Sequence, residues 1–350
     1  MIGCGYWGTN YVRVFNELPS VRLVGACDQR VERLAELQHR YPDVAVSTDV
    51  SDIMSNPAID AVLVSTQASS HYELGLRCLE AGKHVLMEKP LTTRAVDAEH
   101  LIEVSKNYGL TLMVGHTFLY NPAVKKLKEY VSARASGPVF YLYARRTNLG
   151  PIRDDVNAVW DLAPHDVSIF NFLLDGEPEW VSAAGACPLR TSREDVGFIT
   201  LGYPDEVLGH IHVSWADPNK TREVVAVCEE KRIVFNDLDA LESVRVFEKG
   251  VTRRLPLNGA IPTEPSFAAR EGRIVSPPIE SAEPLRRQCE EFIRCVETRT
   301  PPLTDGQGGL SVVRVMEALD RSIAESGSPI RVQAPQEPSR AEREPASSVR

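Results

Sequence analysis

The sequence lacks several features that would place the protein in other classes. Its 350 residues contain no apolar run approaching about 18 residues and no basic segment followed by an apolar stretch near the start. Neither a membrane span nor a signal peptide is therefore predicted, and a cytoplasmic location is expected. The net charge of −9 comes without the clusters of Lys and Arg that nucleic-acid binding requires, so a small-molecule substrate is expected instead.

Cysteine and histidine spacing also excludes two kinds of site. The seven cysteines are odd in number and scattered, with no C-x-x-C pair, which is typical of buried residues in a reducing compartment. The eight histidines form no H-x-x-x-H or H-E-x-x-H cluster, and His210 and His212 alternate along an expected strand. We therefore expect no disulfide framework and no metal.

A G-x-G-x-x-G motif is present at residues 3–8. In a dinucleotide-binding unit, the first glycine permits a tight turn, the second lets the backbone approach a pyrophosphate, and the third allows close helix packing. Helical spacing follows over residues 6–18, then a strand over 21–27, and Asp28 comes 20 residues after Gly8. The alternative, a glycine-rich surface turn, does not account for these following elements.

Asp28 occupies the position at which an acidic residue accepts hydrogen bonds from the adenosine ribose, and this favours NAD over NADP. Arg30 could serve a 2′-phosphate instead, so NADP stays open. The full set expected to bind the cofactor is Gly3, Gly5, Tyr6, Trp7, Gly8, Asp28, Arg30, Thr66, His71, Glu88 and Lys89.

Strand-like and helix-like segments alternate through the first 115 residues. After the first unit, strands are predicted at residues 44–47, 61–65, 83–87 and 111–115, and helices at 31–40, 71–81 and 93–107. Buried-type strands separated by amphipathic helices predict a doubly wound parallel sheet, the Rossmann fold of a dinucleotide-binding domain, over residues 1–120.

The first strand of this sheet is short in the sequence. A central strand of about five residues should precede Gly3, but only Met1 and Ile2 do so. The sequence predicts either that the natural start lies upstream or that a shortened first strand makes the chain fold poorly.

Residues 121–332 predict a second, α+β domain. Helices are expected at residues 123–133, 165–174, 284–297 and 309–325, and strands at 139–145, 180–186, 197–203, 207–215, 223–228, 232–236 and 243–248. Alternation within these strands predicts a large open, mostly antiparallel sheet with one packed face. A second subunit is expected to cover the free face. Residues 333–350, rich in Pro, Glu, Ser and Arg, predict a disordered tail.

Two segments could carry chemistry. The strand at 83–87 ends in Glu88-Lys89-Pro90, which places an ammonium group at the sheet edge where ligands bind. Asp161 and His165 are four residues apart, so a helical turn would place both on one side, and histidine suits proton removal from an alcohol. The plainer interpretations are a solvated lysine and two helix-start residues.

Together, the glycine motif, Glu88-Lys89-Pro90 and Asp161-x-x-x-His165 resemble the Gfo/Idh/MocA family, the glucose-fructose oxidoreductase and inositol dehydrogenase group, over residues 1–330. The resemblance implies hydride transfer between a secondary alcohol and nicotinamide, with Lys89, Asp161 and His165 as the catalytic group. His165 would take the hydroxyl proton, Lys89 would stabilise the oxygen, and Asp161 would orient the substrate or tune the charge of its partners. The resemblance also implies a homodimer or homotetramer built through the second sheet.

Finer resemblance is to nucleotide-sugar dehydrogenases of surface-polysaccharide biosynthesis, which often oxidise a sugar at C3. The polar segment 145–160 suits a polyhydroxylated or anionic substrate, although an exposed loop explains its polarity equally well. The residues expected to bind a sugar or nucleotide sugar are Tyr120, Asn121, Arg146, Asn148, Arg153, Asn157 and Trp160.

Two other functions stay open within the same fold: a non-catalytic NAD(P)-binding regulator and an NAD-dependent glycosidase. Retention of Lys89, Asp161 and His165 together argues against the regulator, because a sensor needs no proton-transfer group. Product analysis would separate the glycosidase from a simple dehydrogenase.

Overall fold

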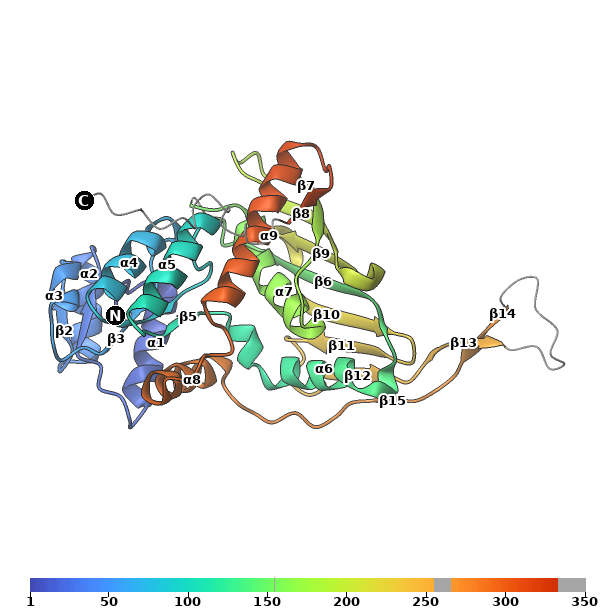
Figure 1. The fold of residues 1–350 in the computed structure, drawn as a ribbon, viewed down its shortest axis with the longest axis horizontal. Helices are drawn as coiled ribbons and strands as arrows, with labels where there is room; N and C mark the ends of the chain where they lie inside the picture. Colours follow the sequence, from blue (N-terminus) through green and yellow to red (C-terminus); the bar gives the residue numbers. More distant parts are fainter. Residues whose placement is uncertain (154, 255–265, 333–350) are drawn as a thin grey trace, which may run out of the picture.

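The computed structural model describes residues 1–153, 155–254 and 266–332, which form two units side by side (Figure 1). The predicted tail at 333–350 lies outside the described residues. The predicted fold class is confirmed: a Rossmann-like parallel sheet is followed by a mixed, mostly antiparallel sheet.

The N-terminal unit is one parallel sheet. Its strands are β1 (Gly25–Cys27), β2 (Ala45–Ser47), β3 (Ala61–Val64), β4 (His84–Met87) and β5 (Leu112–Val114). Ile2 lies between β1 and β3 in parallel bridges to Cys27 and Val64, and its backbone N–H donates to Leu63 at 2.8 Å. The resulting order is β2, β1, residues 1–3, β3, β4 and β5, with every carboxyl end at one edge.

Helices cover both faces of this sheet because successive side chains of each strand point to opposite sides. Its helices are α1 (Tyr6–Glu17), α2 (Val31–Arg40), α3 (Val50–Met54), α4 (His71–Glu80) and α5 (Ala95–Asn107). Leu86 of β4 lies in the apolar cluster with α1 and α2, whereas Val85 and Met87 lie in the cluster with α3, α4 and α5. The short α3 was not among the predicted elements.

The C-terminal unit is a nine-stranded sheet in the order β15-β12-β11-β10-β6-β9-β8-β7-β16. Within this sheet, β6 and β9 are the only described neighbours that pair in parallel. The strands are β6 (Val139–Leu149), β7 (Trp180–Ala186), β8 (Val196–Gly202), β9 (Leu208–Ser214), β10 (Ala216–Cys228), β11 (Arg232–Asn236), β12 (Val244–Phe247), β15 (Ile274–Val275) and β16 (Ile330–Arg331). A separate ribbon, β13 (Gly250–Arg254) with β14 (Ser266–Arg270), extends away from the body in Figure 1.

One face of the large sheet packs against α6 (Pro122–Ser132), α7 (Ala158–Leu174) and α9 (Gly306–Ala324). The opposite face presents apolar and aromatic side chains, including Tyr141, Phe198 and Leu208, which are about half exposed. The helix predicted at 165–174 corresponds to α7, which begins seven residues earlier than expected, at Ala158.

Two C-terminal helices connect the units. α8 (Pro284–Thr298) places Cys289 and Phe292 in the same buried cluster as Tyr11 and Phe15 of α1. α9 packs against both α5 and β7. The C-terminal part of the chain thus completes the N-terminal core, while the domain division at residue 120 stays a prediction.

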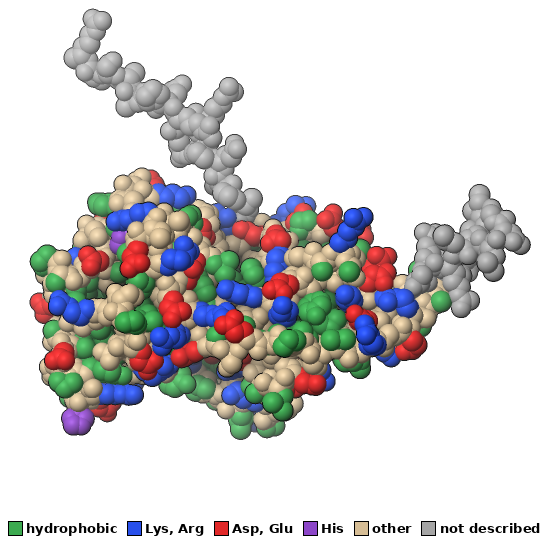
Figure 2. All heavy atoms as spheres, turned by 90° about the horizontal axis from the view of Figure 1, so that it is seen from below, with side chains coloured by type: hydrophobic (Ala, Val, Ile, Leu, Met, Phe, Trp, Pro, Cys, Tyr) green, Lys and Arg blue, Asp and Glu red, His purple; other side chains and the backbone are tan. Residues whose placement is uncertain are grey.

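The surface carries both signs of charge. Figure 2 shows Lys and Arg side chains interspersed with Asp and Glu over one face, rather than gathered by sign. Among the described helices, none is long and apolar enough to span a membrane.

Candidate active site

The glycine motif forms a tight turn between residues 1–3 and α1. Gly3 has φ +91°, and a Cβ there would lie 2.4 Å from the carbonyl oxygen of Ser65. A Cβ at Gly8 would lie 2.1 Å from the carbonyl oxygen of Gly3. Both positions therefore exclude a side chain for reasons internal to the fold.

Gly5 differs from its two neighbours in the motif. A Cβ there would meet only the flexible end of the Arg33 side chain, with Nη1 at 3.2 Å, and Gly5 lines the cavity at the sheet edge. Gly5 is also the N-cap of α1, whose first backbone N–H groups have no intrahelical acceptor. This is the arrangement that receives a pyrophosphate at a helix N-terminus.

A cavity of about 900 Å³ follows the carboxyl edge of the N-terminal sheet. It is large enough for a cofactor-sized ligand. Of the residues predicted to bind the cofactor, its lining includes Gly3, Gly5, Tyr6, Trp7, Asp28, Arg30, Thr66, Glu88 and Lys89. Lining residues that the sequence analysis missed include Gln29, Arg33, Thr48, Asp49, Gln67 and Arg77. Thr48 and Gln67 follow the ends of β2 and β3, a position that could have identified them.

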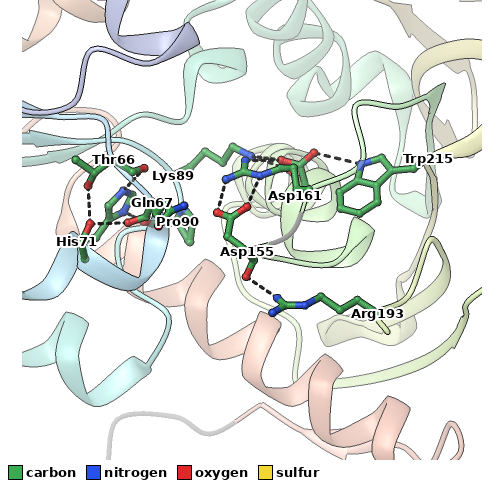
Figure 3. Close-up of polar contacts among 11 residues, drawn as sticks. Thr66, Gln67, His71, Lys89, Pro90, Asp155, Asp161, Arg193 and Trp215 are labelled. Atoms are coloured by element: carbon green, nitrogen blue, oxygen red, sulfur yellow. Dashed lines mark hydrogen bonds and ion pairs between the residues drawn. The ribbon is translucent and has the colours of Figure 1, made fainter. Parts of the chain in front are cut away.

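Gly8 and His71 were also predicted to bind the cofactor but do not line this cavity. The buried His71 ring lies at hydrogen-bond distance from the carbonyl oxygens of Pro90, 2.7 Å, and Thr66, 3.3 Å (Figure 3). His71 thus contacts Pro90 and Thr66, two residues that line the cavity, without lining it itself.

Asp28 directly follows β1, and its carboxylate already accepts hydrogen bonds from within the protein. It accepts hydrogen bonds from the backbone N–H of Cys4, at 2.7 Å, and of Arg30, at 2.9 Å. Burial raises the pKa of Asp28, but these two bonds and the Arg30 side chain outweigh burial and lower it below its usual value. The group is therefore a carboxylate that holds the glycine turn in place and still faces the cavity.

Lys89 joins the two units. Its ammonium group donates to the backbone oxygen of Asp161 at 2.7 Å and to Asp161 Oδ1 at 3.3 Å (Figure 3). Asp161 also accepts from Arg153 Nη1 at 3.1 Å and from Trp215 Nε1 at 3.3 Å. Burial raises the pKa of Asp161, but the charges of Lys89 and Arg153, with the hydrogen bonds from Lys89 and Trp215, outweigh burial and lower it below its usual value, so the group is ionised.

His165 follows Asp161 by about one turn of α7. Its side chain is partly buried and packs edge-on against Phe118 with centroids 5.1 Å apart, and its buried Nδ1 has no hydrogen-bond partner among the described residues. Burial, followed by the charges of Lys89 and Arg146, lowers the pKa of His165 well below its usual value. A neutral imidazole results, which is the form that can accept a proton. Lys89 lines the cavity, whereas Asp161 and His165 are not among its lining residues.

Two of the predicted substrate-binding residues line the cavity. Arg153 makes a bidentate pair with Asp155, at 2.9 and 2.6 Å, in addition to its contact with Asp161. Trp160 donates from Nε1 to Asp320 at 2.8 Å. Both residues therefore border the cavity from the C-terminal unit.

The other five lie outside the cavity lining and make contacts that stabilise the fold. Tyr120 is buried with its hydroxyl 3.0 Å from Thr304 Oγ1, and Arg146 forms a buried bidentate pair with Asp166 at 2.9 and 2.7 Å. Asn121 and Asn157 cap α6 and α7 through their side-chain oxygens, and Asn148 donates to the carbonyl of Gly150.

His116 is a residue of this region that the sequence analysis missed. It follows β5 at the carboxyl edge, is buried, and neither ring nitrogen has a hydrogen-bond partner within the described parts of the chain. Burial and the nearby Lys89 charge lower the pKa of His116 to about 4. Its place directly after a strand of the parallel sheet was the available signal.

Family comparisons agree with this geometry over both units. A model described as an oxidoreductase family with an NAD-binding Rossmann fold matches residues 1–116. A second model, the GFO/IDH/MocA C-terminal domain, matches residues 124–234. The chain belongs to the Gfo/Idh/MocA oxidoreductase family. It is accordingly an NAD(P)-dependent oxidoreductase of the class that acts on CH–OH groups, as the sequence predicted.

Several relatives align over nearly the whole chain. A myo-inositol 2-dehydrogenase of Thermotoga maritima is 24% identical, covering 94% of this chain and 96% of that enzyme. A UDP-N-acetylglucosamine 3-dehydrogenase of Acidithiobacillus ferrooxidans is 23% identical, covering 89% and 93%. Another match is shorter: a 4-carboxy-2-hydroxymuconate-6-semialdehyde dehydrogenase of Sphingobium sp. is 28% identical over 49% of this chain and 57% of that enzyme.

Among solved structures, the WlbA dehydrogenase of Bordetella pertussis, in complex with NADH and UDP-GlcNAcA, superposes with a TM-score of 0.77. It is 21% identical, covering 95% of this chain and 98% of that one. This likeness shows that the two chains share their fold over both units.

Proposed function

We propose that this chain uses NAD to oxidise a secondary hydroxyl group of a sugar or nucleotide sugar, with Lys89, Asp161 and His165 as its catalytic residues. The observation that carries the proposal is the contact of Lys89 with Asp161, which joins the dinucleotide cavity to the helix that bears His165. The Lys89 ammonium, which lines the cavity, thus contacts the Asp161 carboxylate, and the neutral His165 imidazole follows Asp161 by about one turn of α7.

The residues present fit a dinucleotide. Gly5 lines the cavity at the start of α1, where a Cβ would meet only the end of the Arg33 side chain, so the turn presents bare backbone to the cavity. When bound, the nicotinamide supplies the hydride acceptor. Asp28 would accept hydrogen bonds from the adenosine ribose and would repel a 2′-phosphate, so we propose NAD as the preferred form.

Each catalytic side chain has one proposed task. Lys89 donates to Asp161 and has further N–H groups available. It would donate to the substrate oxygen and stabilise its developing negative charge. His165 would accept the hydroxyl proton, for which its depressed pKa leaves it unprotonated. Asp161 would keep the Lys89 ammonium charged and oriented.

A UDP-sugar oxidised at C3 is the finer substrate that we propose. Two curated relatives carry the names of dehydrogenases for inositol and UDP-N-acetylglucosamine, both of which offer rings of secondary hydroxyl groups. Arg153 and Trp160 supply a guanidinium and an aromatic face on the substrate side of the cavity.

The test is incubation of the purified protein with NAD and a panel of UDP-sugars, dTDP-sugars, free hexoses and inositols, following the absorbance of reduced nicotinamide. We expect reduction with a nucleotide sugar and none with the sugar omitted. A pure protein that binds NADH but oxidises none of these compounds would contradict the proposal.

We further propose that copies of the chain assemble through the open face of the large sheet. Phe198 stacks on His212 there with ring centroids 4.5 Å apart, and Tyr141 stacks on Tyr143 at 6.4 Å. A contiguous aromatic and aliphatic face of this kind is normally covered by another subunit.

A further inference from the structure

A buried polar chain runs from the cavity wall into the core behind it. Tyr11 of α1 donates its hydroxyl proton to Glu88 Oε1 at 2.6 Å. Gln288 of α8 donates from Nε2 to the Tyr11 oxygen at 2.7 Å, and Thr117 donates to Gln288 Oε1 at 2.7 Å. Tyr11 and Gln288 are 0% exposed, and Glu88 is 7% exposed. Four separate segments of the chain therefore meet through side-chain hydrogen bonds.

The donors in this chain all point toward Glu88. A tyrosine hydroxyl has one proton, and the Gln288 amide group occupies the tyrosine oxygen from the other side, so that proton is directed to Glu88. The second carboxylate oxygen, Oε2, accepts from the backbone N–H of Lys89 at 3.1 Å. Glu88 is thus held as a hydrogen-bond acceptor at both oxygens.

The contact between Glu88 and Tyr11 depends on a glycine at residue 115. A Cβ at Gly115 would lie 3.0 Å from Glu88 Oε1 and 3.2 Å from the Tyr11 oxygen. Glycine at this position leaves the space in which the two side chains meet. Glu88 also lines the cavity beside Lys89, whereas Tyr11 and Gln288 do not.

We propose that Gln288 is a cofactor-positioning residue, which acts through Tyr11 to hold Glu88 as an acceptor for a donor group of the bound dinucleotide. The inference rests on the proposed function for the identity of the cofactor. It assigns a part in cofactor binding to α8, which lies nearly 200 residues further along the sequence than Glu88.

The charge state of Glu88 links this chain to pH. Burial raises the pKa of Glu88, and the hydrogen bond from Tyr11, the Lys89 charge and backbone N–H, and Arg153 counteract part of that rise. Burial followed by the Glu88 charge raises the pKa of Tyr11, so Tyr11 keeps its proton; the neighbouring Cys289 thiol likewise stays protonated. As pH falls through the raised pKa, Glu88 becomes protonated and one acceptor is lost, so cofactor affinity should fall on the acidic side.

Removing the donors behind Glu88 should move that loss to higher pH. The variants are Gln288→Leu and Tyr11→Phe, with Glu297→Gln as a matched control on the exposed side of α8. NADH affinity is measured by fluorescence titration from pH 5 to 9, with the melting temperature of each variant measured in parallel. We expect about a tenfold loss of affinity at neutral pH in both variants and an upward shift of the acidic midpoint. Glu297→Gln should match the wild type.

Thr117→Val keeps the shape of its side chain and removes only the outermost donor, so a smaller shift in the same direction is expected even if a core variant folds poorly. Affinity and midpoint equal to those of the wild type in all three variants would overturn the proposal. A loss of affinity that follows the melting temperature, without any shift in the midpoint, would show a merely structural role and would equally overturn it. Because NADH binding needs no sugar, the result is independent of whether any sugar is oxidised.

Discussion

His116, which is buried, and His165, which is partly buried, both lie near the Lys89 charge. Burial and nearby positive charge lower both pKa values, that of His116 to about 4. Each ring is therefore neutral in the folded protein at neutral pH, whereas in the unfolded chain it takes up a proton near its usual pKa of 6.5. This difference couples stability to pH.

The free energy of unfolding should fall as pH falls below the unfolded pKa of 6.5, because the unfolded chain then binds protons that the folded chain excludes. For His116, whose folded pKa is about 4, the contribution present above pH 6.5 is about 3 kcal/mol. Urea unfolding at a series of pH values measures the slope. His116→Phe should flatten it, and an unchanged slope would refute the assignment.

Arg146 and Asp166 form the buried ion pair of α7 and β6, at 4% and 1% side-chain exposure. Arg146→Met leaves a buried carboxylate without its partner, and we expect it to lower the free energy of unfolding by about 3–5 kcal/mol. The double variant with Asp166→Leu should recover most of that loss. Equal destabilisation of the single and double variants, measured by urea unfolding, would argue against an isolated-charge penalty.

At the scale of elements, the turn from residues 1–3 into α1 sets the position of the dinucleotide site. Its three glycines have different reasons for lacking a side chain: Gly3 and Gly8 touch backbone within the protein, whereas Gly5 faces the cavity. The fold therefore requires glycine at residues 3 and 8, whereas the ligand requires glycine at residue 5.

Substitution of Gly8 and Gly5 by alanine should separate these two requirements. Gly8→Ala places a Cβ 2.1 Å from a backbone oxygen, so the melting temperature should drop by several degrees. Gly5→Ala should leave the melting temperature nearly unchanged and weaken NADH binding by about tenfold or more, since only the approach of the pyrophosphate is blocked. Equal thermal destabilisation by both changes would contradict this division.

The boundaries of helices and strands were predictable where apolar residues recur at a regular spacing. The predictions were wrong where a polar segment lies inside a helix. α7 was predicted only from residue 165, because the preceding segment is polar and Pro164 usually marks a helix start; in the structure Pro164 lies inside the helix and Asn157 caps it. The strand expected at 21–27 is limited to Gly25–Cys27, because its partner β2 offers only three residues for pairing. His116 was missed because a lone histidine carries no motif.

At the scale of the whole molecule, the sequence revealed the amphipathic faces of the helices but not their partners. The apolar side of α8 was predictable from spacing, yet its contact with α1 depends on a long-range arrangement that no local pattern encodes. The same limit applies to Tyr120 and Arg146, whose polar groups pair with Thr304 and Asp166 inside the fold.

The open face of the large sheet gives a prediction about assembly. Phe198 and Leu208 are 49% and 46% exposed there, so we expect the wild type to sediment as a dimer or tetramer. Phe198→Asp combined with Leu208→Asp should shift sedimentation velocity toward the monomer while NADH binding persists. A monomeric wild type would refute assembly through this face.

The central claim is that, beside a dinucleotide cavity, Lys89 stabilises the substrate oxygen while His165 accepts its proton. Its most direct test measures sugar-dependent reduction of NAD by the wild type, Lys89→Ala and His165→Asn, with NADH affinity determined for each. We predict that both variants bind NADH within a few-fold of the wild type and lose about 100-fold or more in turnover. Either variant turning over at close to the wild-type rate would contradict the account.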